Sequence, residues 1–187
     1  MNIAIIGSQG DLAQALTNRL GQDHSVTCYG KDEFNFLDKT SIIALADQIH
    51  AADVIICCAG VFTDYDSWDM FTINAVAPVF LLEQLSVRLS TAHVILIGSH
   101  AAMWTSWPDI TLTRLSYNVS KECLQSFVTG LAQGAGTNLT LSILNPSRFQ
   151  SKLSNYQGYP VDYVVESVQT IINSNAPLLV VEYNTFK

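Results

Sequence analysis

Short apolar runs alternate along this chain with longer segments of helical period, and this alternation is the feature that most constrains the fold. The apolar runs cover residues 2–6, 25–29, 53–58, 93–97, 139–144 and 177–183, with a weaker run at 34–36. Continuous apolar runs of this length are typical of strands buried on both faces, as in a parallel sheet. The sequence therefore predicts a parallel sheet of about seven strands.

The segments between these runs predict the helices, at about 10–20, 39–50, 68–91, 114–134 and 161–174. Asp38 marks the start of the second helix, and Asp64, Asp66 and Asp69 mark the start of the third. Strand and helix in regular alternation predict a Rossmann-type, doubly wound α/β fold with right-handed crossovers. No repeat or linker marks a second domain, so we expect one domain over residues 1–187.

The charge composition excludes one class of partner. Only 13% of the residues are charged and the formal net charge is −7. Nucleic-acid binding needs clustered Lys and Arg, so we expect no nucleic-acid partner. The first apolar run stops at Gly7, which is too short for a signal peptide or a membrane span. We therefore expect a cytoplasmic protein without membrane contact.

The cysteines give no sign of a metal site. Cys28, Cys57, Cys58 and Cys123 form no C-x-x-C pair and show none of the Cys/His spacings of a zinc site. We interpret them as buried, reduced thiols, because free cysteine is among the most buried residue types. We expect no bound metal.

The turn after the first strand has the composition of a phosphate-binding loop. Gly7, Gly10 and Ala13 form a G-x-x-G-x-x-A pattern at a junction of strand and helix. Small residues there allow backbone N–H groups to approach a pyrophosphate, which the helix N-terminus also attracts. We expect this turn to bind a nucleotide cofactor, although the carboxylate of Asp11 is unfavourable beside a phosphate. The predicted cofactor residues of the turn are Gly7, Ser8, Gln9, Gly10, Asp11 and Leu12.

The end of the second strand decides between the two nicotinamide dinucleotides. An acidic residue there holds the ribose hydroxyls of NAD, whereas a basic residue accommodates the 2′-phosphate of NADP. Lys31 follows Gly30 at this point and favours NADP. NAD stays possible, because Asp32 or Glu33 serves a 2′-hydroxyl if the strand ends one residue later.

Two Tyr-x-x-x-Lys pairs occur, a spacing that arises by chance in roughly one chain of this composition in five. Tyr117 and Lys121 begin a segment of helical period, where positions i and i+4 are neighbours. Tyr183 ends an apolar run and Lys187 is the last residue of the sequence, so we interpret that second pair as accidental. A cation near Tyr117 favours its phenolate and makes it a general acid/base. Ser99, at the end of another apolar run, is placed to orient a substrate oxygen.

These motifs together resemble the short-chain dehydrogenase/reductase family over most of the chain. Ser99, Tyr117 and Lys121 resemble the family's catalytic serine, tyrosine and lysine, and Asn74 falls on the asparagine that holds a water of the proton relay. In CCAG, Ala59 and Gly60 match a motif that lies along the cofactor, with Cys58 in place of the usual asparagine. In LNPSRFQS, the positions that match the loop at the nicotinamide end are Pro146, Phe149 and Ser151.

The resemblance also has departures. The glycine pattern differs from the family's commoner G-x-x-x-G-x-G, and Ser99 and Tyr117 are eighteen positions apart, which is wider than usual. The residues around 100–114, with Trp104 and Trp107, and those around 152–161 predict a short substrate lid. No charged residue stands out there as a reader of an acid or a phosphate. The family's usual pairing through its two long central helices implies a homodimer or homotetramer.

The resulting hypothesis is an NADP-preferring oxidoreductase that interconverts a carbonyl and an alcohol on a small molecule. The resemblance implies that Tyr117 is the general acid/base, Lys121 lowers its pKa and binds ribose, and Ser99 orients the substrate. Two alternatives stay open. One is a non-catalytic NAD(P)-binding redox sensor, and the other is an epimerase or dehydratase of the same family.

Overall fold

Six parallel strands within the described ranges form one sheet, in the order β2-β1-β3-β4-β5-β6. The computed structural model describes residues 1–62, 66–103, 110–134, 138–174 and 180–182. The strands are β1 (Asn2–Ile6), β2 (Ser25–Tyr29), β3 (Val54–Cys57), β4 (Ala92–Ile97), β5 (Leu139–Asn145) and β6 (Val180–Glu182). The doubly wound parallel sheet predicted from the apolar runs is confirmed.

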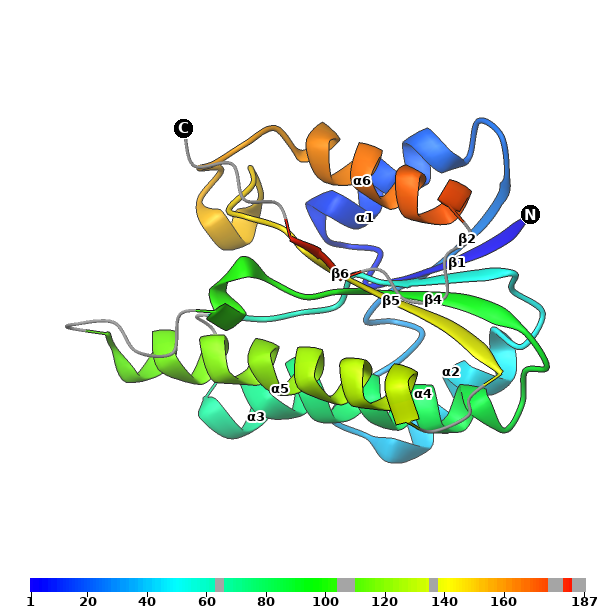
Figure 1. Cartoon of the computed structure of the whole chain (residues 1–187), viewed down its shortest axis with the longest axis horizontal. Coiled ribbons are helices and arrows are strands. Elements are labelled where there is room, and N and C mark those ends of the chain that lie inside the picture. The colour runs from blue at the N-terminus through cyan, green and yellow to red at the C-terminus, as the bar shows by residue number, and fades with distance from the viewer. Residues whose placement is uncertain (63–65, 104–109, 135–137, 175–179, 183–187) are drawn as a thin grey trace.

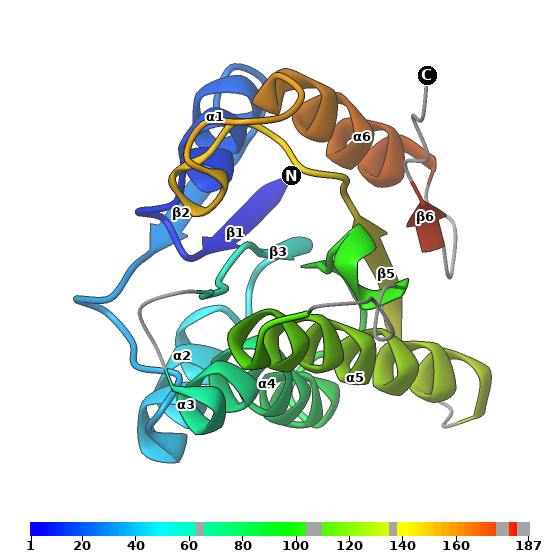
Figure 2. The ribbon, with the colours of Figure 1, turned by 90° about the vertical axis from the view of Figure 1, so that its left-hand side faces the viewer.

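Helices cover both faces of this sheet (Figure 1). One face carries α1 (Asp11–Leu20) and α6 (Val161–Ser174), and the other carries the remaining long helices. These are α2 (Lys39–Gln48), α3 (Ser67–Phe71), α4 (Ala77–Ser86) and α5 (Leu112–Gly134). Figure 2 shows the three layers from the side, with the sheet between the two sets of helices. Among the described residues, no helix is both long enough and apolar enough to cross a bilayer.

The predicted strand at 34–36 is wrong. These residues follow a turn in which the N–H groups of Glu33 and Phe34 both donate to the carbonyl of Gly30. Phe34 and Phe36 are buried, and their ring centres lie 4.8 Å apart in the core beneath α2. The apolar pattern therefore reports core packing of a loop, not a seventh strand. Asp38 then starts α2, as predicted, by accepting a hydrogen bond from Thr40.

The predicted long helix at 68–91 is divided into two by a π-helical turn, Thr72–Val76. Asp66 begins α3 by accepting a bond from the Asp69 N–H, as predicted, while Asp64 lies outside the described residues. Pro78 stands at the start of α4 and has no N–H to donate to the preceding turn. Such turns often accompany functional sites, and this one carries Asn74.

The chain order places a ligand crevice at one point of the sheet edge. After β1 the chain moves outward to β2 and then crosses back to β3 on the other side of β1. In open α/β sheets, ligands bind where the strand order reverses, beyond the carboxyl ends of the strands. The residues after β1 and β3 are therefore expected to form the walls of a site.

Candidate functional site

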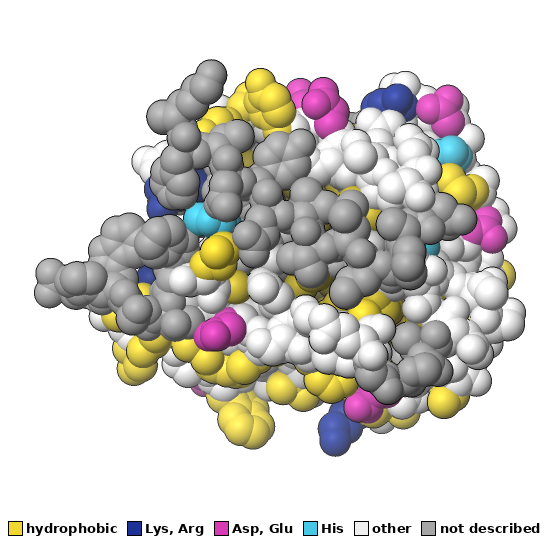
Figure 3. Space-filling view, in the orientation of Figure 1, with side chains coloured by type: hydrophobic (Ala, Val, Ile, Leu, Met, Phe, Trp, Pro, Cys, Tyr) yellow, Lys and Arg dark blue, Asp and Glu magenta, His cyan; other side chains and the backbone are white. Residues whose placement is uncertain are grey.

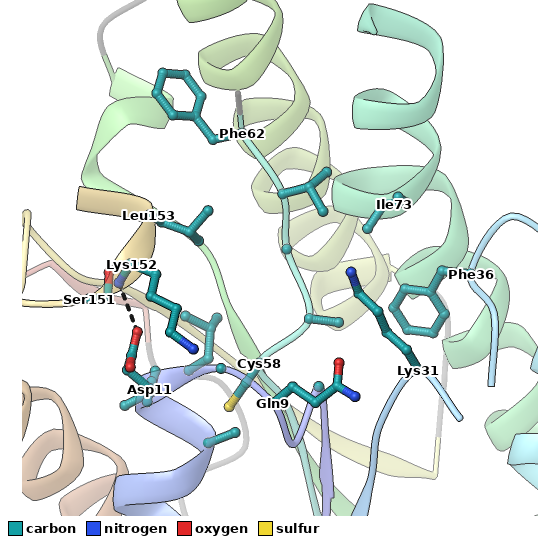
Figure 4. A pocket seen from close by; sticks show the side chains of 18 of the residues that line it. Gln9, Asp11, Lys31, Phe36, Cys58, Phe62, Ile73, Ser151, Lys152 and Leu153 are labelled. Carbon is teal, nitrogen blue, oxygen red and sulfur yellow. Dashed lines mark hydrogen bonds between the residues drawn. The ribbon is translucent and has the colours of Figure 1, made fainter. Parts of the chain in front are cut away.

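A cleft of about 550 Å³ lies at this reversal point (Figure 4). It is lined by residues that follow β1, β2, β3 and β4, together with residues of α5 and of the loop after β5. Of the predicted cofactor residues, those that line it are Gly7, Gln9, Gly10, Asp11, Leu12, Lys31, Ala59, Gly60, Lys121, Phe149 and Ser151. Ser8 and Pro146 are not among the lining residues.

The glycine turn forms the floor of the cleft. Gly7 has a φ of +92°, and a Cβ there would lie 2.8 Å from the backbone N of Ala59, so only glycine fits between the two strand ends. Gly10 is the N-cap of α1, and no side chain caps the helix. The first turn of α1 therefore presents backbone N–H groups and the positive end of the helix dipole to the cleft, as an anion site requires.

A second segment closes over this turn. The carboxylate of Asp11 accepts a 2.7 Å hydrogen bond from the backbone N–H of Lys152, the first residue of a short 3₁₀ helix, η3 (Lys152–Ser154). In Figure 4 the side chain of Lys152 reaches into the cleft above the glycine turn. Asp11 is thus occupied by a hydrogen-bond donor, and a cation stands beside it.

Lys31 lines the cleft at the end of β2, and in Figure 4 it points inward from the side opposite Lys152. The neighbouring acidic residue Glu33 turns back to accept a 2.6 Å bond from the N–H of Gly30. Neither Asp32 nor Glu33 is among the residues that line the cleft. The charge offered to a ligand at this end is therefore positive.

Tyr117 lines the other end of the cleft, and Ser99, which is not among the lining residues, lies beside it. The Ser99 hydroxyl lies close enough to the phenol of Tyr117 to lower its pKa, and it accepts a hydrogen bond of 3.1 Å from the N–H of Ala101. Ser99 is itself held by Asn145, whose side-chain oxygen accepts the Ser99 N–H at 3.1 Å. A Cβ on Gly98 would collide with that same oxygen, so glycine is required before the serine. These contacts fix the serine hydroxyl next to the phenol.

Lys121 lies one turn after Tyr117 on α5, as predicted, and is buried, with 4% of its surface exposed. Its Nζ donates to the carbonyl of Ile97 at 3.1 Å and stands 6.0 Å from the centre of the Tyr117 ring. Burial lowers the pKa of Lys121 to about 8. An amine at this position is mostly charged at neutral pH and can donate to a ligand in the cleft.

The effect of Lys121 on the Tyr117 pKa stays a prediction. Burial raises the pKa of Tyr117, while the Ser99 hydrogen bond and the charge of Arg114 lower it. Arg114 lies on the same helix three residues earlier, so its guanidinium and the phenol share a face. Arg114 is therefore a cation that acts on the Tyr117 pKa and that the spacing did not indicate. Sequence reasoning paired Lys121 with the phenol because spacing along a helix does not tell where a long side chain ends.

Asn74 is fully buried in the π-helical turn beneath the cleft wall. Its amide makes two 2.9 Å bonds to the backbone of Val61, accepting from the N–H and donating to the carbonyl, and it also donates to Ser120 at 3.1 Å. Asn74 therefore fixes the loop after β3, which contains Ala59 and Gly60. It does not line the cleft itself.

Residues of the loop after β5 line two different cavities. Phe149 and Ser151 line the cleft, whereas Pro146 and Ser147 line a neighbouring cavity of about 340 Å³ beside α6, which Phe149 also borders. Ser151 begins η3, and its side chain and that of Ser154 cap each other's backbone N–H groups. Of these predicted residues, Phe149 and Ser151 are the ones placed to touch a ligand in the cleft.

No family model and no curated protein matches the sequence. Solved structures match over almost the whole chain at low identity. The protein lin1944 from Listeria innocua has a TM-score of 0.79 at 15% identity, covering 96% of this chain and 98% of that one. A 3-alpha-hydroxysteroid dehydrogenase from a Pseudomonas species, solved with NADH, has a TM-score of 0.78 at 18% identity, covering 96% and 94%.

A short-chain dehydrogenase from Burkholderia cenocepacia, solved with NADP, has a TM-score of 0.81 at 13% identity, covering 97% of this chain and 87% of that one. The chain has the fold of the short-chain dehydrogenases. This agrees with the resemblance seen in the motifs, and the sheet and its reversal point now account for where those motifs lie.

Several features of this dehydrogenase fold escaped the sequence analysis. Phe62 packs its ring against Tyr117, Arg114 stands over Phe62, Asn145 holds Ser99, and Lys152 reaches the cleft. Lys152 directly follows Ser151, so the motif that predicted Ser151 ends one residue before Lys152. Phe62 similarly follows Ala59 and Gly60 along the cleft wall. Nothing in the spacing pointed to Arg114.

The cysteines of the dehydrogenase fold are only partly as predicted. Cys57 is buried, Cys28 and Cys58 are half-buried, and Cys123 is exposed, so the expectation of four buried thiols is wrong for Cys123. Cys58 lines the cleft, and burial raises the pKa of its thiol, so it is a protonated, weakly reactive wall residue. Within the described ranges, no group of His, Cys, Asp or Glu could hold a metal ion.

Some predicted features lie outside the described residues. These are Trp104 and Trp107 in the first part of the lid, and the pair Tyr183 and Lys187. The rest of the predicted lid is a 3₁₀ helix (His100–Met103), the start of α5, and η3 with the turn that follows it.

Proposed function

We propose that this protein is an NADP-preferring oxidoreductase that interconverts a carbonyl and an alcohol on a small molecule. The observation that carries the proposal is that Tyr117, with Ser99 beside it, lines a cleft that offers a helix N-terminus and three lysines. The lysines are Lys31, Lys121 and Lys152. The structural neighbours solved with NADP or NADH support the same reading.

The residues of the cleft fit such a cofactor. The glycine turn and Lys152 would hold the pyrophosphate, Lys31 the 2′-phosphate, and Lys121 the nicotinamide ribose. Glycine at position 7 lets the ends of β1 and β3 approach each other at the cleft, because a Cβ there would collide with the backbone of Ala59. When bound, the reduced nicotinamide supplies a hydride to the carbonyl carbon.

The protein side of the reaction is a proton transfer. Ser99 donates a hydrogen bond to the carbonyl oxygen and holds it beside the phenol, and Tyr117 gives that oxygen its proton as the alcohol forms. Because burial raises the pKa of Tyr117, the phenol is protonated at neutral pH and ready to donate. Asn74 keeps the cleft wall in place through its bonds to Val61.

Two alternatives use the same cleft. A redox sensor would bind the cofactor without turnover, and an epimerase or dehydratase would reduce and reoxidise a cofactor that it retains after purification. The pairing of Ser99 with Tyr117 favours the oxidoreductase, because a sensor has no use for an oriented phenol. We also propose a cytoplasmic homodimer or homotetramer that pairs through α4 and α5, where Phe127 of α5 and Val76, just before α4, are exposed. Light scattering after size-exclusion chromatography tests the assembly.

The experiment that tests the reaction is a screen of small aldehydes, ketones and oxo acids that follows NADPH absorbance. Turnover of at least one carbonyl class by the wild type, and none by Tyr117→Phe, is the expected result. NADPH uptake without consumption across the screen would favour the sensor. Cofactor retained through purification, with no net consumption, would favour the epimerase.

A further inference from the structure

A cation lies beside the catalytic end of the cleft. The guanidinium of Arg114 stands 5.0 Å from the centre of the Phe62 ring. That ring in turn packs edge-on against Tyr117, with the two ring centres 5.0 Å apart. Arg114, Phe62 and Tyr117 therefore form one continuous stack, and the last two line the cleft.

Arg114 is half-buried, and no ion pair between described residues includes it. The ion pairs of the described ranges join Arg19 to Asp23 and Arg88 to Asp47, both far along the chain from this stack. Asp66, which is four positions after Phe62, accepts a hydrogen bond from the N–H of Asp69. Burying part of a guanidinium costs free energy, and an anion that accepts its hydrogen bonds offsets that cost. The planar guanidinium matches the geometry of a carboxylate.

In the described part of the chain, apolar side chains line this end of the cleft. Val61, Phe62 and Leu153 line the cleft, and in Figure 4 Phe62 lies away from Gln9. The ring contact with Phe62 puts Tyr117 at the same end. The lysines that line the cleft belong to the cofactor residues already assigned. One arginine above an aromatic face suits a singly charged group attached to a flat or apolar body.

We propose that Arg114 binds a carboxylate of the substrate, so that the preferred substrates are carbonyl compounds that carry a carboxylate on an apolar or aromatic body. This inference rests on the proposed function, because it assigns the substrate of the same site. Phe62 supports the body of the substrate, and Ser99 and Tyr117 hold its carbonyl oxygen. The sequence-based expectation that no charged residue reads an acid is replaced by this assignment.

The test compares benzoate with benzamide, which have the same shape and differ in charge. Calorimetric titration of each into the protein saturated with NADP⁺ should show benzoate binding about tenfold more tightly. In Arg114→Gln the two should bind equally, with the affinity for benzamide changed by less than about twofold. Arg114→Lys should keep part of the preference, since it keeps the charge but loses the fork. Arg19→Gln, a surface arginine on α1, is the matched control and should behave as the wild type.

Equal binding of benzoate and benzamide to the wild type, or a preference that survives in Arg114→Gln, overturns the proposal. If Arg114→Gln fails to fold, as judged by its thermal melt, the proposal is tested by the ratio of benzoate to benzamide affinity in the wild type and in Arg114→Lys. Failure of the proposed function shows separately, as absence of NADP⁺ uptake in the first titration. The benzoate preference is then measured on the free protein, where the same ratio supports or overturns the role of Arg114.

Discussion

The carboxylate of Asp11 accepts a hydrogen bond of 2.7 Å from the backbone N–H of Lys152, which is 141 residues away in the chain. This contact joins the glycine turn after β1 to η3 after β5, so two segments that are distant in sequence close the same end of the cleft. It also explains how an acidic residue is tolerated where a pyrophosphate is expected, because a donor and a cation accompany the carboxylate.

Lys152→Gln is therefore expected to weaken NADPH binding by about five- to tenfold at low salt, because the cation beside the glycine turn is lost while the backbone bond to Asp11 remains. Asp11→Asn keeps an acceptor for Lys152 but removes the negative charge, and is expected to tighten NADPH binding by a few-fold. Fluorescence titration of NADPH measures both. Lys39→Gln, on α2 outside the cleft, is the control, and equal affinities in all four proteins would contradict the role of Lys152.

Lys31 is expected to set the choice between the two cofactors. Since Glu33 bonds to the N–H of Gly30, Lys31 is the charged side chain that β2 offers to the ligand. NADPH should bind about tenfold more tightly than NADH, and Lys31→Ala should abolish the difference mainly by weakening NADPH binding. Titration of both cofactors into both proteins decides, and a wild type that binds NADH equally well would refute the assignment.

The pH dependence of the reaction rate should report the ionisation of Tyr117 and the effect of the Arg114 charge on it. Burial holds the pKa of the phenol above its usual value of about 10, so reduction of a neutral aldehyde should not depend on phenol ionisation at neutral pH. As the pH rises through the raised pKa of the phenol, the rate of carbonyl reduction should fall and the rate of alcohol oxidation should rise. This part of the pH profile is called the phenol limb. Arg114→Gln removes a charge that lowers the pKa and should move this limb to higher pH. A shift to lower pH in kcat/KM would contradict this electrostatic account.

His93 is expected to make the stability of the fold depend on pH. It is buried in the sheet with its Nε2 2.8 Å from the Ser142 hydroxyl, and burial lowers its pKa. The folded state prefers neutral imidazole, so this contribution is complete above the unfolded pKa of about 6.5 and is lost as the pH falls through the folded pKa. Urea unfolding at pH about 7.5 and about 5 should show the wild type losing on the order of 1 kcal/mol more than His93→Gln. Equal losses in the two proteins would disprove it.

Much of the fold could be predicted because apolar runs and their breaks are local signals. β1 and β2 have the predicted bounds, and so does α6, since a polar residue or a glycine stands where each run stops. The run at 34–36 misled because two buried phenylalanines in a loop have the same pattern as a short strand. The sequence analysis missed the π-helical turn at Asn74. The turn is accompanied by hydrogen bonds to Val61, which lies outside the helix, and helical periodicity does not show such contacts.

The candidate site divides in the same way. The glycine turn, Ser99, Tyr117 and Lys121 carry local signals of type and spacing, so they could be named in advance. Phe62 and Arg114 could not, because their importance comes from a contact between a loop and a helix 52 positions apart in the sequence. Spacing gave Lys121 the right helix face, but the direction of its side chain, toward Ile97, is set by tertiary packing.

The central claim is that Tyr117 is the proton donor in a reaction that needs bound NADPH. It is tested most directly by measuring NADPH affinity and carbonyl turnover in the same preparations of wild type and Tyr117→Phe. We predict that the two proteins bind NADPH within about twofold of one another, while turnover in Tyr117→Phe falls by about a hundredfold or more. Unchanged turnover in Tyr117→Phe, or no saturable NADPH binding by the wild type, would contradict the account.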